Sequence, residues 1–163
     1  FYLNFPADGS LKEPVAFVLL VSAVTAILNP VVLLVNGAIS GVEVNLLGLI
    51  GLNAAFLVLS PVVIGVASGV YLLSVKTFVG KDPNFAQIFR ILAYAYGPMV
   101  LFWLPVVNAL VFAYSFLVLV VIGLQSVYQT PFLTALVTAL VGFVPVSLAY
   151  MLYIVNSGSV AFL

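Results

Sequence analysis

Residues 15–28 read VAFVLLVSAVTAIL, and this stretch decides the fold because its apolar side chains leave no polar face. A strand of a membrane barrel alternates apolar and polar residues over about ten positions. Neither this stretch nor FLVLVVIGL at residues 116–124 alternates in that way. Because an unpaired backbone amide in lipid costs several kcal/mol, a segment that is apolar on all sides bonds its amides internally. We therefore expect membrane-spanning α-helices.

The composition of the whole chain places it in lipid. Of the 163 residues, 66% are hydrophobic and only 5% are charged, whereas about a quarter of the residues in a soluble domain are charged. Three runs without a charged residue each exceed the roughly 18 apolar residues that mark a spanning helix. They cover Pro14–Val42, Val44–Val75 and Ile91–Leu163. The predicted fold class is an all-α, polytopic integral membrane protein with a bundle of five transmembrane helices.

Prolines, asparagines and glycines divide the chain into five predicted spans within a single domain over residues 1–163. The spans cover about residues 15–35, 46–79, 85–104, 106–124 and 131–153. Pro14, Pro105 and Pro131 suit the first turns of helices. Asn36 followed by Gly37 offers a stop after the first span.

The second span is longer than the roughly 20 residues that cross a bilayer, so it either tilts and protrudes or breaks at Pro61. We favour one long kinked helix, because a membrane helix tolerates proline where neighbours bond the freed carbonyl. Behind it, residues 80–84 read as a turn, and Asn84 with Gln87 has the spacing of a capping box. The third span is therefore predicted to start at Phe85, and residues 125–131 form the polar link before the fifth.

All four basic residues fall on one side of the membrane in this topology. They are Lys12, Lys76, Lys81 and Arg90. Because lysine and arginine near spans are retained in the cytoplasm, the amino terminus is expected inside and the carboxyl terminus outside. Segregation by chance is the alternative. We expect Lys76, Lys81 and Arg90 to contact lipid headgroups, since long basic side chains reach toward phosphate from helix ends.

Several classes of function lack the residues that they need. The chain has no cysteine and no histidine, which removes disulfides, thiol nucleophiles, imidazole bases and common metal ligands. A formal net charge of zero attracts no nucleic acid. Asp82 can pair with the amino-terminal carboxylates, and Lys76 can assist a hydroxyl nucleophile, but nothing requires either; the other carboxylates are Asp8, Glu13 and Glu43. We expect no enzyme, no cofactor and no metal.

Small residues four apart occur in two predicted spans. GVASG places Gly65 and Gly69 on one helix face, and ALVTA does the same with Ala135 and Ala139. Such pairs let helix backbones approach closely in lipid. They predict helix packing, either in a dimer or among the chain's own five helices, and we favour the second. GAISG at residues 37–41 has the same spacing but is expected in a loop.

Amide side chains occur in or near the spans, and an amide in hydrocarbon needs a partner. They are Asn29, Asn36, Asn53 and Asn108. They can line a conduction path or a ligand pocket, but more often such amides bond across helices or sit at helix ends. No charged residue is predicted deep in a span, which weakens ion or proton transport.

Dispersed residues along almost the whole chain resemble the prokaryotic Yip1 domain family. The resemblance rests on FPADGSLKEPVAF, VGKDPNFAQIFRILAYAYGPMV, WLP and VLVVIGLQSVYQTPFLTAL. The positions that match the family pattern are Gly80, Phe85, Ala93, Tyr94, Pro98, Gly123 and Leu124. The chain departs from it at Val79-Gly80-Lys81, where the family has two glycines, and in QSVYQT, where it often has a histidine. The resemblance implies five spans with a cytosolic amino terminus. The GTPase-linked trafficking role of eukaryotic relatives does not carry over.

These observations predict a non-catalytic multi-pass membrane protein. It would act as an accessory or scaffold subunit, or organise membranes, by packing against partners. The alternative is a permease or channel component that conducts a small solute, and an intramembrane lipid enzyme is a weaker third. Expected partners are the lipid bilayer and other membrane subunits or a second copy. The expected location is a prokaryotic cell membrane, with no targeting segment, although a start at Phe1 indicates processing or a leader.

Overall fold

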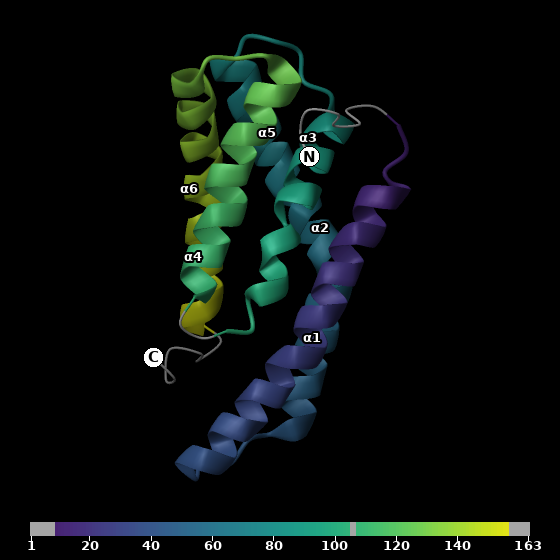
Figure 1. The fold of residues 1–163 in the computed structure, drawn as a ribbon, viewed down its shortest axis with the longest axis vertical. Coiled ribbons are helices and arrows are strands. Elements are labelled where there is room, and N and C mark those ends of the chain that lie inside the picture. The colour runs from purple at the N-terminus through teal and green to yellow at the C-terminus, as the bar shows by residue number, and fades with distance from the viewer. Residues whose placement is uncertain (1–8, 105–106, 157–163) are drawn as a thin grey trace.

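The chain folds entirely into helices in the part that the computed structural model describes, residues 9–104 and 107–156 (Figure 1). The elements are α1 Lys12–Ser40, α2 Leu46–Phe78, α3 Phe85–Ala95, the 3-10 helix η2 Gly97–Leu101, α4 Asn108–Ala113, the π-helix η3 Tyr114–Val118, α5 Leu119–Tyr128 and α6 Phe132–Asn156. Because α4, η3 and α5 follow one another directly, they form one helix with a π-turn inside it. Asp8, Pro105 and the tail from residue 157 lie outside the described residues.

The predicted fold class is confirmed: the protein is an all-helical, polytopic membrane protein with five apolar helical segments. Within the described residues, four helices are long and apolar enough to cross a membrane; they are Lys12–Ser40, Leu46–Phe78, Asn108–Tyr128 and Phe132–Ala149. The third segment in chain order, Phe85–Leu101, is shorter. Its 11 α-helical and 5 3-10 residues rise about 26 Å, against a hydrocarbon layer of about 30 Å.

The segments pack in two unequal groups with α3 between them. α1 and α2 form a long antiparallel hairpin on one side, and α5 and α6 lie together on the other (Figure 1). α3 contacts α1, α2 and α5. Its buried residues, from Ile88 to Ala95, occupy every side of the helix, so protein covers it all round. At the end away from the α2–α3 turn, the hairpin extends beyond the rest of the bundle (Figure 1).

Helix α1 runs past the stop predicted at Asn36 and Gly37 and ends at Ser40. Gly41, with a φ of 70°, is the left-handed residue that closes the helix, and its N–H donates to the Gly37 carbonyl. Gly37 has a packing role instead, since a Cβ there would lie 2.5 Å from Cγ2 of Val44. The first four residues of GAISG are therefore helical, which corrects the expectation of a loop.

Helix α2 is continuous through Pro61, as favoured from the sequence. Proline has no N–H, so the carbonyl of residue 57 loses its helical partner. The hydroxyl of Ser60 donates to that Leu57 carbonyl at 3.0 Å. A neighbouring side chain thus bonds the freed group, as expected for a proline inside a membrane helix.

The third segment is not a single α-helix to Leu104. α3 begins behind Asn84, whose side chain accepts from the Ala86 N–H at 2.9 Å, and it ends at Ala95. The cause of the early end is Pro98, because its missing N–H and its ring disrupt the α-helical turn before it. The chain continues as η2, which holds Pro98 in its first turn. Residues 85–101 thus become a short, two-part apolar segment.

The fourth segment is longer than predicted at its carboxyl end. α5 continues past Leu124 to Tyr128, so half of the predicted link at residues 125–131 is helical. Gln129 ends the helix in the left-handed region with a φ of 49°. The sequence QSVYQTP reads as polar, but an amide or hydroxyl at the membrane surface does not prevent another helical turn.

Candidate functional site

The carboxylates of the described chain lie at a helix start and in two turns. Within residues 9–104 and 107–156, no three His, Cys, Asp or Glu residues come together as a metal site would require. Glu13 is exposed at the start of α1, Glu43 in the α1–α2 turn and Asp82 in the α2–α3 turn.

The basic residues lie at one end of the bundle, and Arg90 is the most buried of them. Arg90 lies in α3 and is 2% exposed. Its Nη2 donates to the Ser10 carbonyl at 2.6 Å. Gly9 makes room for this contact, since its φ is +121° and a Cβ there would lie 2.9 Å from Nη2. The segment before α1 thus covers the guanidinium, and a headgroup contact of Arg90 stays a prediction.

Lys81 joins two turns at the same end. Its Nζ donates to the Tyr128 carbonyl at 2.5 Å, so its charge lies at the carboxyl end of α5, where the helix dipole favours a cation. The Tyr128 hydroxyl in turn donates to Oε1 of Gln87 at 3.3 Å. This contact occupies the side chain that the capping-box spacing had assigned to the start of α3. Headgroup binding by Lys81 remains a prediction beside this observed role.

Lys76 differs from the other two residues in this group. It lies in the last turn of α2 with an exposed side chain, a position that suits the headgroup contact predicted for it. Lys12 follows Ser10 by two residues, so the contact of Ser10 with Arg90 places Lys12 at the same end of the bundle as the start of α3. All four basic residues therefore gather at one end of the bundle.

Hydroxyl groups join α1 to the third segment in the interior. Ser22 and Tyr96 share a hydrogen bond of 3.2 Å between their hydroxyl oxygens. Thr25 donates to the Met99 carbonyl at 2.9 Å, which bonds α1 to η2 directly. The Met99 carbonyl also accepts from the Phe102 N–H at 3.0 Å, so the bond from Thr25 adds a contact between helices to the main-chain bond of η2.

Tyr71 joins α2 to the fourth and fifth segments. Its hydroxyl donates to the Phe116 carbonyl at 2.5 Å, inside the π-turn η3. Its ring lies against Gly142 of α6, where an added Cβ would come within 2.5 Å of the ring carbons Cδ1 and Cε1. The side chain is completely buried. One residue thus fixes the positions of two neighbouring helices.

The amides behave as the cross-helix alternative predicts. Asn29 of α1 donates to Oδ1 of Asn53 at 3.2 Å, and Asn53 donates to the Leu49 carbonyl at 2.8 Å. A groove of about 250 Å³ lies beside this pair between α1 and α2; it is lined by Ala23, Ala26, Ile27, Pro30, Ile50, Asn53, Ala54 and Leu57. Asn36 and Asn108 lie near helix ends, at the last turn of α1 and the first of α4.

The small residues predicted for packing fall into different environments. Ala135 and Ala139 of α6 are both fully buried, which fits packing among the chain's own helices. A Cβ added at Gly65 of α2 would lie 4.0 Å from Cε2 of Phe89. A Cβ added at Gly69 would have no atom within 4 Å. The open side of Gly69 leaves room for a partner, so its packing role remains a prediction.

The residues that carry the family pattern lie mostly at the basic end and along α3. Gly80 has a φ of +68° in the α2–α3 turn, a conformation that favours glycine. Phe85 begins α3, Ala93 is buried in it, and the Tyr94 ring lies 5.3 Å from that of Phe17. Pro98 starts η2, and Gly123 and Leu124 are buried in α5. The pattern therefore concerns turns and the central helix.

Sequence reasoning missed three residues that organise this structure. Tyr71 and Gly142 form the closest approach described between α2 and α6, and Ser22 bonds α1 to Tyr96. Each is an isolated polar or small residue in an apolar run. A lone tyrosine or glycine shows no partner in the sequence, because its partner lies on another helix.

The comparison with known proteins identifies a family. The family model described as the Yip1 domain matches residues 1–155. No curated protein and no solved structure matches the chain.

Proposed function

The chain belongs to the Yip1 domain family, and from that premise we propose that it is a non-catalytic accessory or scaffold protein. It organises a membrane by packing its helices laterally against another membrane protein. We place it in a prokaryotic cell membrane, with its amino terminus and the basic end in the cytoplasm, since lysine and arginine are retained there.

The observation that carries the proposal is that polar side chains within the apolar helices form hydrogen bonds to other helices of the chain. Asn53 bonds Asn29, Tyr71 bonds the Phe116 carbonyl, and Tyr96 bonds Ser22. Each contact joins two helices of the same chain. A polar group committed to a helix contact supports a structural role for the interior rather than a conduction path.

The outward surface supplies the means of lateral packing. Large apolar side chains are exposed along α1, α2 and α6. In a bilayer these side chains contact either lipid tails or other helices. Gly69 adds an open position on α2 where a second backbone can come close. We therefore assign the Gly69 side of α2 as the face that meets the partner.

The experiment is purification of the tagged chain in its native lipids after brief crosslinking, with identification of what accompanies it. The expected result is one membrane protein at a fixed ratio to the chain. Gly69→Leu should reduce its recovery at least about fivefold by filling the open side. Gly51→Leu is the matched control, because Gly51 also lies on α2 with no atom within 4 Å of an added Cβ.

Two outcomes would count against the scaffold role. One is a chain that runs alone and loses nothing with either variant. The other is passage of a small solute through vesicles that contain only the purified chain, since this result favours a permease or channel component. Equal loss with Gly69→Leu and Gly51→Leu would reject the assigned face while leaving a partner.

A further inference from the structure

The structure has two hydrophobic lengths at one end of the molecule. The Thr25 hydroxyl bonds the Met99 carbonyl, so these two residues lie at the same height. From there α1 continues to Ser40, about 22 Å further, whereas η2 ends at Leu101 after about 4 Å. The α1–α2 hairpin therefore outruns the third segment by about 18 Å.

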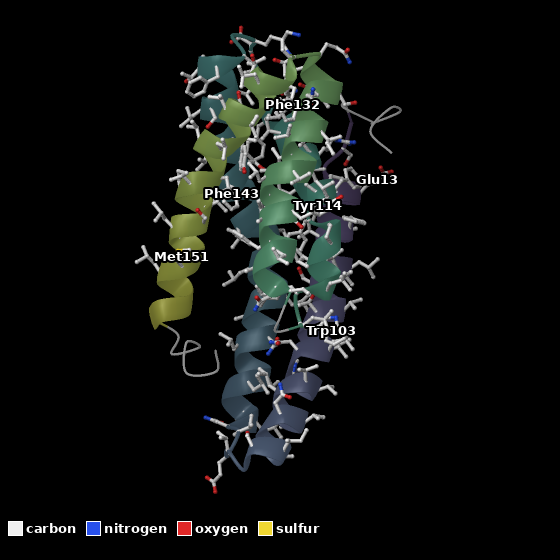
Figure 2. All side chains as sticks on the ribbon, turned by 60° about the vertical axis from the view of Figure 1, so that its left-hand side comes forward. Glu13, Trp103, Tyr114, Phe132, Phe143 and Met151 are labelled. Atoms are coloured by element: carbon white, nitrogen blue, oxygen red, sulfur yellow. The ribbon has the colours of Figure 1, made fainter. Side chains whose placement is uncertain are left out.

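Polar boundary residues lie at two heights as well. Trp103 follows η2, and tryptophan is enriched where the hydrocarbon meets the headgroups. Figure 2 shows Trp103 at the end of the shorter helices, while the hairpin continues well beyond it. On the hairpin the first charge is Glu43 in the α1–α2 turn. The boundary thus lies at Trp103 beside the short helices and at the turn beside the long ones.

The part of the hairpin beyond Trp103, which we name the hairpin tip (residues 31–59), is largely apolar, with Glu43 as its one charged residue, and few of its residues are buried. Its buried residues are Gly37, Leu49 and Asn53. Ile39 is 80% exposed and Leu47 is 84% exposed. Exposure of this many apolar side chains to water is unfavourable, so the tip needs an apolar surrounding.

The distribution of the exposed side chains identifies that surrounding. On α2, exposed positions run from Leu46 to Ala55 and are interrupted only by Leu49 and Asn53, which face α1. A single partner helix would cover one stripe of such a surface. Acyl chains cover all of it at once. A fluid of lipid tails is therefore the occupant that the pattern fits.

We propose that the hairpin tip is a lipid-binding element that selects or induces a hydrocarbon layer thicker than the one beside α4–α6. The ligand is the acyl chain of a long-chain phospholipid, and the specificity is for its length. Bilayers accommodate such mismatch by local thickening or by tilting of the helices, at a modest cost for each ångström. The protein would then gather long-chain lipid on its α1–α2 side.

The test uses the purified full chain, which has no natural cysteine, in phosphatidylcholine vesicles with monounsaturated chains of 14, 18 or 22 carbons. Ser40→Cys reports the tip through its rate of labelling by a membrane-impermeant maleimide, added on both sides of the bilayer. We expect at least about a fivefold fall from the shortest to the longest lipid. Lys76→Cys at the basic end is the control and should label at a constant rate, because neighbouring charges hold that end at the headgroups.

Either form of constant labelling at residue 40 would overturn the proposal. A high rate in all three lipids places the tip in water. A low rate in all three means that protein covers it, and crosslinking between two copies through the same cysteine would identify a second chain as the cover. Since no partner protein is present in these vesicles, the outcome is independent of the proposed scaffold role.

Discussion

Single residues supply the hydrogen bonds that this chain needs where a helix is interrupted or a charge is buried. Pro61 removes one helical hydrogen bond from α2, and Ser60 replaces it by donating to the Leu57 carbonyl at 3.0 Å. Both residues are adjacent in the sequence, so the repair is local. Arg90 shows the opposite case, because its Nη2 donates to the carbonyl of Ser10, which is distant in the sequence.

Replacing Ser60 with alanine is expected to destabilise the protein by about 1–3 kcal/mol, since a buried carbonyl would lose its partner. The measurement is the free energy of unfolding in mixed detergent micelles. In a Pro61→Ala background the residue 61 N–H can bond the Leu57 carbonyl, so the same change should cost less. An equal cost in both backgrounds would show that Ser60 acts through something other than this carbonyl.

At the scale of elements, two kinds of contact hold the helices together. The first is close packing between α2 and α6, where the Tyr71 ring lies directly against Gly142, which has no side chain. Hydrogen bonds to main-chain carbonyls occur where Thr25 meets η2 and where Tyr71 meets η3. Both carbonyls belong to non-α segments, so side chains from neighbouring helices bond where the regular ladder is altered.

Gly142→Ala should lower the free energy of unfolding by about 1–3 kcal/mol, because the added methyl overlaps the Tyr71 ring. The loss should shrink when Tyr71 is replaced by leucine, and a double-mutant cycle measures this coupling. Gly51→Ala is the matched control on an exposed, open position. It should leave stability unchanged or raise it by up to about 1 kcal/mol through helix propensity. A larger loss at Gly51 than at Gly142 would refute the close approach.

Lys81→Met should loosen the carboxyl end of α5, since the Nζ contact to the Tyr128 carbonyl is lost. Hydrogen exchange of the backbone amides around residues 125–132 should rise about two- to fivefold, as expected for a helix-end charge worth about 0.3–1 kcal/mol. Lys76→Met removes an exposed charge of the same kind and should leave this exchange unchanged. Equal effects of both variants would indicate a general charge effect.

At the scale of the whole molecule, the segments differ in length although all are apolar. The hairpin helices have 29 and 33 residues, whereas the third segment consists of α3, with 11 residues, and the 3-10 helix η2, with 5. Hydrophobicity sets which segments enter lipid, but the length of each sets where its ends lie. The basic residues gather at the end of the bundle away from the α1–α2 turn. There Lys81 bonds the Tyr128 carbonyl and Arg90 bonds the Ser10 carbonyl.

Topology follows from this arrangement and can be measured in intact cells. Ser40→Cys and Lys76→Cys, each in the cysteine-free chain, should be labelled from opposite sides of the membrane, because they lie at opposite ends of α1 and α2. The cytoplasmic retention of basic residues predicts that only Ser40→Cys reacts with an impermeant maleimide added outside. Reaction of both cysteines from the same side would contradict the crossing of the membrane by α2 between them.

Much of the fold was predictable because membrane helices satisfy their hydrogen bonds within a few residues of sequence. The long apolar runs, the continuity of α2 through Pro61 and the cap at Asn84 all depend on neighbours along the chain. The end of α1 and the break at Pro98 were missed. At these places a local stop signal competes with packing against distant residues, and the sequence alone does not show which prevails.

The candidate site also has features that follow from the sequence and features that only the tertiary structure sets. Sequence alone determined that the chain lies in lipid, that its charged residues lie outside the middle of the long apolar runs and that amides such as Asn53 need partners. The reason is that burying an unpaired polar group in hydrocarbon is costly whatever the fold. Only the tertiary structure decided that Asn53 meets Asn29, that Tyr71 lies on Gly142 and that the hairpin outruns its neighbours. These facts depend on the relative height and rotation of separate helices, which side-chain contacts between distant residues set.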